Sequence, residues 1–289
     1  MKQQKKYMMN ILSTSFENIK QSKSFYQIFK SLERGLKKYE IDFYIIGAIA
    51  KDIWLEGIYN KKTGRVTRDI DLGVLVKNKE KFDLLKQYLI NKENFRDSKD
   101  NPFVLISNNN YQIDIIPFGE IEKEKLKLLK GTTFSSLNSE GLHDIYKSGV
   151  PEVRIGKTNR YKVCPLPGLV ILKLISWNDR PELRIEDLQD VSIIITHYFE
   201  INDERIFNNH NELFEDGKGL NDIGARVLGR DMAKILIDNP GLNKKIKKIL
   251  SKNTENQKSP LGKTMVKYID INLTEAIQNI KEIIRGLND

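Results

Sequence analysis

Three aspartates in two apolar segments have the residue type and spacing that suit chemistry. Asp69 and Asp71 stand two apart in "GRVTRDIDLGVLV", and Asp114 lies in "YQIDIIPFGEIE". Side chains two apart on a strand point to one face, so the first two carboxylates project together while Ile70 and Leu72 face the other way. Carboxylates this close repel one another unless a cation neutralises them, and their oxygens suit Mg²⁺. The pair therefore predicts a site for a divalent cation.

Asp114 is flanked by isoleucines, which predicts a largely buried strand. A carboxylate there is costly without a partner charge. If this strand lies beside that of Asp69 and Asp71, the three carboxylates converge. Such a set can hold two divalent ions, which activate an attacking oxygen and steady a leaving pyrophosphate.

A glycine step precedes the aspartates. In "YIIGAIAKDIW", the apolar run Ile41 to Ile46 predicts a buried strand that Gly47 ends, and Ala48 to Gly57 has helical spacing. Two small residues at a strand-to-helix turn let the backbone approach phosphates, and a helix start offers free N–H groups to an anion. A lone D-x-D or a lone glycine is a weak signal, so the order of the three features carries the prediction.

The elements that must position these residues alternate between helix and strand over the first ~160 residues, which favours an α/β unit. The predicted elements are a helix over 24–39, a strand over 69–76, a helix over 79–91, and a hairpin with strands over 103–107 and 111–116. Beyond "CPLPG", helical patterns dominate over 169–177, 184–197, 224–237 and 266–284. We expect a catalytic domain over 1–163 and a helical C-terminal domain over 164–289.

Composition limits the class of protein. The 289 residues are 39% hydrophobic and 30% charged, which is typical of a soluble globular chain. No run approaches the ~18 apolar residues of a membrane span, and polar residues interrupt the N-terminal segment before a secretory core forms. One cysteine, Cys164, excludes an internal disulfide, so we expect a cytoplasmic protein. The net charge of +9 favours polyanionic partners, although the Lys- and Asn-rich segments equally fit a biased genome.

At these motifs the sequence resembles the nucleotidyltransferase superfamily, whose catalytic domain is similar to that of DNA polymerase β. It resembles most closely the AbiEii/AbiGii-type nucleotidyltransferase toxins. The matching passages are "IIGAIAKDIWLEG", "RVTRDIDLGVLV", "IDIIPFGEIE" and "LPGLVILKLISWNDRPELRIEDLQDV", within about Phe43 to Tyr198. The resemblance implies a polymerase β-like fold with a mixed sheet, followed by a mainly helical C-terminal domain.

The resemblance also implies roles for single residues. Asp69 and Asp71 would bind metal, Mg²⁺ or Mn²⁺, and Asp114 would complete the site as a base or ligand. The other residues it assigns are Gly47 and Ala48 beside the triphosphate, Arg65 and Thr67 supporting nucleotide or loop geometry, Lys173 directed at phosphates, and Asp187 as the acidic residue of the next helix.

Two residues depart from the family's pattern. The usual Gly-Gly or Gly-Ser turn is here Gly47-Ala48, and the usual Lys-Asp is here Glu186-Asp187. From its own spacing Lys173 equally suits the edge of a helical core with its ammonium at solvent. The later charged residues equally suit surface ion pairs on a helix: Arg180, Arg184, Glu186, Asp187 and Asp190.

The expected activity is metal-dependent transfer of an NMP from a nucleoside triphosphate to an acceptor. Lysines over 244–248 and 263–267 suit RNA, and the resemblance suggests a tRNA end, with the chain acting as the toxin of a toxin–antitoxin pair and binding an antitoxin protein. Alternatives are NMP transfer to a hydroxyl of a partner protein, or an inactive nucleotide- or RNA-binding protein. Aminoglycoside-modifying enzymes share the fold, but a +9 chain would repel their polycationic substrates.

Overall fold

The computed structural model describes residues 12–15, 17–19, 23–63, 67, 69–122, 139–215, 217–255, 258–268 and 270–289. A five-stranded mixed sheet occupies its first part, in the order β2-β3-β6-β5-β4. These strands are β2 (Asp42–Ile46), β3 (Asp69–Leu75), β4 (Arg96–Asp97), β5 (Val104–Ile106) and β6 (Gln112–Phe118). The β3–β6 pair is parallel and the other neighbours in this sheet are antiparallel.

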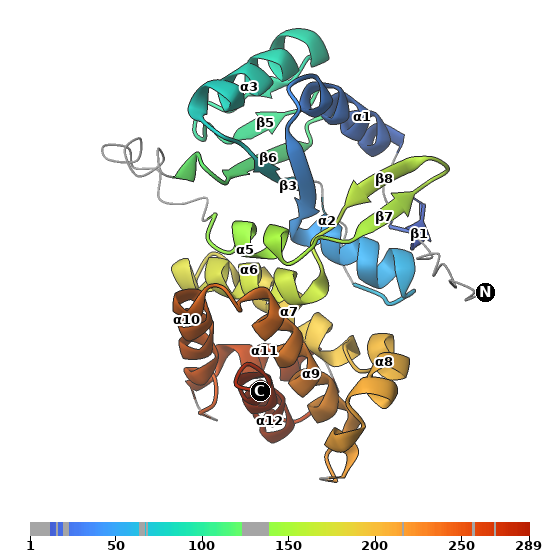
Figure 1. Ribbon diagram of the computed structural model, residues 1–289, viewed down its shortest axis with the longest axis vertical. Coiled ribbons are helices and arrows are strands. Elements are labelled where there is room, and N and C mark those ends of the chain that lie inside the picture. Colours follow the sequence, from blue (N-terminus) through green and yellow to red (C-terminus); the bar gives the residue numbers. More distant parts are fainter. Residues whose placement is uncertain are drawn as a thin grey trace, which may run out of the picture.

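Helices α1 (Lys23–Lys38) and α3 (Lys79–Glu93) lie together against the upper end of this sheet (Figure 1). They pack closely, since a Cβ at Gly35 would lie 3.1 Å from both Leu85 and Leu89. The Asn78 side chain accepts the Lys81 N–H at the start of α3, and Asn94 ends the helix in a left-handed conformation. Such caps satisfy backbone groups that a helix end leaves free.

The strand-to-helix turn predicted around Gly47 is present. β2 passes at Gly47 directly into α2 (Gly47–Asp52), which continues as a π-helical segment, η1 (Ile53–Ile58). Gly47 has φ +67°, a conformation that side chains with a Cβ rarely adopt. The helix therefore begins at the glycine itself, one residue earlier than its apolar spacing predicts.

A second, three-stranded sheet was not predicted from the sequence. Strands β7 (Glu152–Ile155) and β8 (Asn159–Lys162) form a hairpin, and β1 (Ser13–Thr14) pairs parallel with β7. The Arg154 N–H donates to the Leu12 carbonyl at 2.9 Å, and the Gly156 N–H donates to the Thr14 carbonyl at 2.8 Å. Short strands with mixed polar residues give little periodicity, which is why the pattern did not indicate them.

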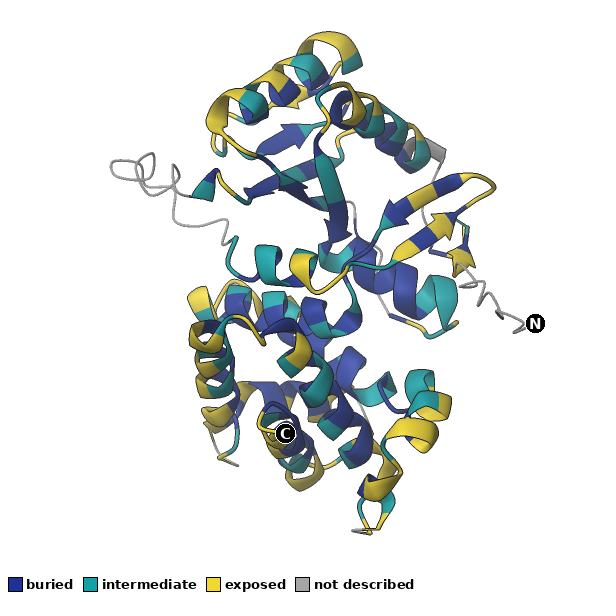
Figure 2. Cartoon of the chain, viewed as in Figure 1, coloured by how far each residue is buried: buried dark blue, intermediate teal, exposed yellow. Residues whose placement is uncertain are grey.

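Helices make up the rest of the described chain, as predicted. They are α5 (Leu142–Lys147), α6 (Leu166–Asp179), α7 (Ile185–His197), α8 (Asp203–Asn209), α9 (Leu220–Ile235), α10 (Pro240–Ser251), α11 (Pro260–Tyr268) and α12 (Leu273–Gly286), with short 3-10 turns at η2 (Glu200–Asn202) and η3 (Asn211–Phe214). Buried residues fill both the sheet layer and the interior of the helical part (Figure 2). An α/β unit with a mixed sheet followed by a mainly helical part is thus confirmed.

One detail of the helical part differs from prediction. The single helix expected over 266–284 is two helices, because Asn272 and Glu275 form a capping box that begins α12. The Lys- and Asn-rich sequence after residue 242 begins inside α10, where Leu242, Ile246 and Ile249 are buried on one face. No helix within the described ranges has the length and apolar character needed to cross a bilayer.

Candidate active site

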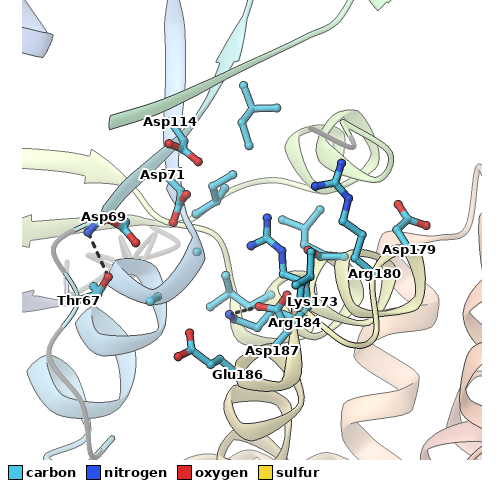
Figure 3. Close-up of a pocket in the computed structure, with 18 of the residues that line it drawn as sticks. Thr67, Asp69, Asp71, Asp114, Lys173, Asp179, Arg180, Arg184, Glu186 and Asp187 are labelled. Carbon is cyan, nitrogen blue, oxygen red and sulfur yellow. Dashed lines mark hydrogen bonds and ion pairs between the residues drawn. The ribbon is translucent and has the colours of Figure 1, made fainter. Parts of the chain in front are cut away.

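A pocket of about 270 Å³ lies between the sheet and helices α6 and α7 (Figure 3). Residues from strands β3 and β6 form one wall, the Gly47 turn forms a second, and the α6–α7 region forms the wall opposite. The lining residues are Ile46, Gly47, Ala48, Thr67, Asp69, Asp71, Gln112, Asp114, Ile116, Leu142, Leu169, Leu172, Lys173, Ser176, Asp179, Arg180, Leu183, Arg184, Glu186 and Asp187. A concave site with charged groups of both signs is a usual place for ligand chemistry.

The strand register brings the three aspartates to one wall. In the parallel β3–β6 pair, Asp71 lies opposite Asp114 and Asp69 lies opposite Gln112. Paired residues on adjacent strands point to the same face, and so do residues two apart, so the three carboxylates share that face. The adjacency of the two strands, on which the sequence argument depended, is therefore present.

The acidic wall is electrostatically strained. Burial raises the pKa of Asp71 to about 7, and the neighbouring Asp114 and Asp69 add to the rise against the opposing influence of Lys173 and Arg184. Burial also raises the pKa of Asp114, with Asp69 adding to the rise; the Gln112 amide, which donates to Asp114 at 2.9 Å, opposes it. Within the described residues no lysine, arginine or histidine forms an ion pair with any of the three carboxylates.

These carboxylates fit a divalent cation by their chemistry. They are hard oxygen ligands that repel one another and form no ion pair with the side chains that the structure describes, so Mg²⁺ or Mn²⁺ would relieve the repulsion. In the described ranges, no group of three His, Cys, Asp or Glu side chains is arranged so that it could already hold a metal ion. The acidic wall thus offers ligands rather than a closed cage.

Gly47 contacts the acidic wall directly. A Cβ at this position would lie 1.9 Å from Oδ2 of Asp71, and the backbone there has φ +67°. Both facts require glycine, so the turn approaches the Asp71 carboxylate more closely than any other residue would allow. Ala48 follows it on the pocket lining.

Thr67 supports the start of β3. It is buried and its hydroxyl accepts the Asp69 backbone N–H at 3.2 Å. This contact fixes the backbone where the first aspartate enters the strand (Figure 3). Arg65, the other residue that the resemblance singles out before the aspartates, lies outside the described residues.

Lys173 and Asp187 meet on the opposite wall. The Lys173 ammonium is 3.0 Å from Oδ1 of Asp187 and 2.6 Å from Oδ2 of Asp190. Burial alone would lower the pKa of Lys173, but Asp190 and then Asp187 raise it above its ordinary value, so the amine stays charged. Oδ2 of Asp187 is buried without a hydrogen-bond partner among the described residues. Lys173 is therefore held in an ion-pair network instead of extending to solvent.

Arg180 and Arg184, which the sequence suggested only as members of surface ion pairs on a helix, line the pocket as well. Figure 3 shows both side chains on the wall facing the aspartates. Arg184 lies near enough to Asp71 and Asp114 to oppose, in small part, the rise in the pKa of both. A signal was available, since both arginines stand in the "NDRPELRIED" turn that connects α6 to α7.

No protein-family model matches the sequence, and no curated protein matches it. Three solved structures resemble the fold at low similarity. The antibiotic-resistance factor ANT(2'')-Ia is 10% identical with a TM-score of 0.39, over 68% of this chain and 98% of that chain. A CCA-adding enzyme in complex with CTP is 12% identical with a TM-score of 0.34, over 84% of this chain and 57% of that chain.

The third is the Thermotoga maritima CCA-adding enzyme complexed with tRNA, which is 12% identical with a TM-score of 0.28, over 97% of this chain and 85% of that chain. Identities and TM-scores this low carry no information about activity. The function is therefore inferred from the side chains of the pocket.

Proposed function

We propose that this chain is a metal-dependent nucleotidyltransferase of the AbiEii/AbiGii type, which moves an NMP from a nucleoside triphosphate to an acceptor hydroxyl. The observation that carries the proposal is the acidic wall: Asp69, Asp71 and Asp114 face one pocket, and none of them forms an ion pair with another described residue. A structural role would pair such carboxylates with lysine or arginine, as happens elsewhere in this chain.

In this proposal the acidic wall binds Mg²⁺ or Mn²⁺ through Asp69, Asp71 and Asp114. When bound, the ion would stabilise the negative charge of the pentacoordinate transition state and of the leaving pyrophosphate. The acceptor oxygen forms a bond to the α-phosphorus while the bond from that phosphorus to pyrophosphate breaks. Asp114 takes the acceptor proton, and the hydrogen bond from Gln112 orients its carboxylate for this step.

The remaining lining residues bind the triphosphate. Gly47 and Ala48 let the backbone approach the phosphates, because no side chain larger than a methyl group intervenes. Lys173, Arg180 and Arg184 offer positive charge from the facing wall, where guanidinium groups suit phosphate oxygens. Thr67 holds the backbone that leads into β3.

The test is release of pyrophosphate from each of the four NTPs with Mg²⁺, in the presence of total RNA and protein. Asp69→Ala combined with Asp71→Ala removes the ligands and abolishes release. The control is Glu80→Ala combined with Asp100→Ala, which removes two exposed carboxylates outside the pocket lining and leaves release unchanged. Release that survives the first pair of substitutions contradicts the proposal.

RNA, specifically a tRNA end, is the proposed acceptor. Helix α10 exposes Lys244 and Lys248, and α11 exposes Lys263 and Lys267. Clustered lysines bind a phosphate backbone and make the affinity depend on salt. A gel that separates labelled RNA from labelled protein, after incubation with each labelled NTP, distinguishes this acceptor from a protein hydroxyl.

The same proposal places the chain in the cytoplasm as the toxin of a toxin–antitoxin pair. Expression of the intact chain should then arrest growth, since tRNA ends modified by NMP transfer would no longer serve translation. Co-expression of the product of the adjacent reading frame should relieve the arrest. The Asp69→Ala, Asp71→Ala variant should be harmless, and arrest by that variant would separate toxicity from NMP transfer.

A further inference from the structure

A row of alternating charges lies beneath the pocket, buried between α2, α6 and α7. The Lys51 ammonium is 3.4 Å from Oδ1 of Asp52 and 2.7 Å from Oδ1 of Asp190. Asp190 also binds Lys173, at 2.6 Å, and Lys173 binds Asp187 at 3.0 Å. The order in space is therefore Asp52, Lys51, Asp190, Lys173, Asp187.

The residues of this row differ in whether they line the pocket. Lys51 has no exposed surface and Asp190 is 2% exposed, and neither lines the pocket. Lys173 and Asp187 do line it. Lys51 and Asp190 can therefore influence a ligand only through the side chains they contact.

Stability alone is a poor explanation for Lys51. Burying two charges costs desolvation energy that their attraction rarely exceeds, and apolar residues of similar volume usually serve at least as well. The helix of Lys51 packs into the core, since Ile49, Ala50 and Ile53 are fully buried. A lysine there indicates a requirement for charge at a fixed position.

That requirement follows from how Asp190 is shared. Each of its oxygens faces a different lysine: Oδ1 accepts a hydrogen bond from Lys51, and Oδ2 forms an ion pair with Lys173. The two lysines together lower the pKa of Asp190 to about 2 against the effect of burial. Without Lys51, both oxygens would be free to attract Lys173, which would move away from Asp187 and from the pocket.

We propose that Lys51 and Asp190 are positioning residues that hold the Lys173 ammonium at the pocket wall for the triphosphate. Lys51 fixes one oxygen of Asp190, and the other oxygen then sets where Lys173 stands. This inference rests on the proposed nucleotidyl transfer, because it assigns Lys173 a phosphate to contact. It adds that two residues outside the pocket determine how well that contact is made.

A double-mutant cycle tests the inference on the full-length chain. Lys51→Gln keeps a hydrogen-bond donor toward Asp190 but removes the charge, and it should lower kcat/KM for the NTP by about 10- to 100-fold, as small misplacements of a binding group do. Lys173→Gln should have an effect at least as large. Lys51→Gln added to Lys173→Gln should then lower kcat/KM no further, within about twofold.

Lys86 supplies the matched control. It is another buried lysine, lies on α3 outside the pocket lining, and is paired with Asp97 at 2.8 Å and with the Pro102 carbonyl at 2.6 Å. Lys86→Gln should reduce stability in urea unfolding and leave kcat/KM unchanged. The inference would be overturned if the losses of kcat/KM in Lys51→Gln and Lys173→Gln multiplied in the double variant. It would also be overturned if Lys86→Gln lost as much kcat/KM as Lys51→Gln.

Asp190→Asn gives a second route if Lys51→Gln folds poorly. It keeps the size and one acceptor oxygen of the side chain, and it should lower kcat/KM in the same non-additive way with Lys173→Gln. Wild-type kcat/KM in a folded Asp190→Asn variant would refute the positioning role. Absence of NTP turnover in the wild type would instead refute the proposed function, and the inference would fall with it.

Discussion

Two clusters of carboxylates flank one pocket and have opposite electrostatics. On the acidic wall the pKa of Asp71 is raised to about 7 by burial and by neighbouring carboxylates. In the ion-pair row beneath it, Lys173 and Lys51 outweigh burial and lower the pKa of Asp190 to about 2. Both carboxylates lose solvent, so the difference lies in their partners. The acidic wall is arranged for a cation from outside the chain, whereas the row carries its own cations.

The largest effect should come from breaking the row. Asp190→Ala leaves two buried lysines short of a partner and should reduce the free energy of unfolding by about 3–5 kcal/mol, measured in urea at neutral pH. Because the folded pKa of Asp190 lies below its ordinary 3.8, its stabilisation is present above pH ~4 and disappears as pH falls toward about 2. The free energies of unfolding of the wild type and of Asp190→Ala should therefore approach each other as the pH falls. A loss below ~1 kcal/mol at neutral pH would contradict the comparison.

The close approach of Gly47 to the acidic wall gives the next effect. Gly47→Ala should lose about 2–4 kcal/mol, because a Cβ would meet Asp71 and φ is positive. Gly156→Ala is the control, since Gly156 has φ +76° but nothing within 4 Å of its Cβ position, and it should lose only about 1–2 kcal/mol. Asp71→Ala in the Gly47→Ala background should recover the difference. Equal losses at the two glycines would show that the carboxylate contact is unimportant.

Removing a charge from the acidic wall should raise the free energy of unfolding, whereas removing one from the ion-pair row should lower it. Asp71→Asn should raise the free energy of unfolding by about 1–3 kcal/mol above pH 7 while abolishing activity. The pKa of Asp71 in the folded chain is above its ordinary 3.8. The stability that its protonated form contributes is therefore fully present below pH ~4 and is lost as pH rises through about 7. The gain should therefore vanish near pH 4. Mg²⁺ should stabilise the wild type more than the variant in thermal unfolding.

Salt should distinguish the clusters most weakly. The residues of the acidic wall are partly exposed to solvent, so dissolved ions weaken the repulsion between their carboxylates. Added NaCl should therefore stabilise the wild type relative to Asp71→Asn by less than ~1 kcal/mol. The buried row should respond little, because ions do not reach it. A salt response in Asp190→Asn larger than that in Asp71→Asn would reverse the assignment of the two clusters.

The sequence alone predicted those features of the site that depend on residues close together in the chain. The two-residue period of a strand determines that Asp69 and Asp71 share a face, and the apolar run before Gly47 indicates the turn. The features that join distant residues depended on packing. Nothing in the spacing states that Lys51 meets Asp190, 139 residues later, or that the loop with Arg180 and Arg184 faces the aspartates.

The prediction of secondary structure failed in two places where apolar periodicity carries too little information. One cap, Asn272, separates α11 from α12 within a continuous helical pattern. The hairpin of β7 and β8 is too short for periodicity to indicate it. The domain division at residue 163 and the roles of the site residues stay predictions.

The pairing of β1 with β7 has a practical consequence. β7 bonds to β8 on one side, and Leu12 and Thr14 occupy the hydrogen-bonding groups of its other side. Deleting the residues up to and including Thr14 would leave the backbone N–H groups of Arg154 and Gly156 without these partners. A strand edge uncovered in this way can pair with another chain. Expression variants shortened at the N-terminus should therefore associate or aggregate, whereas an affinity tag ahead of residue 1 leaves this protection intact.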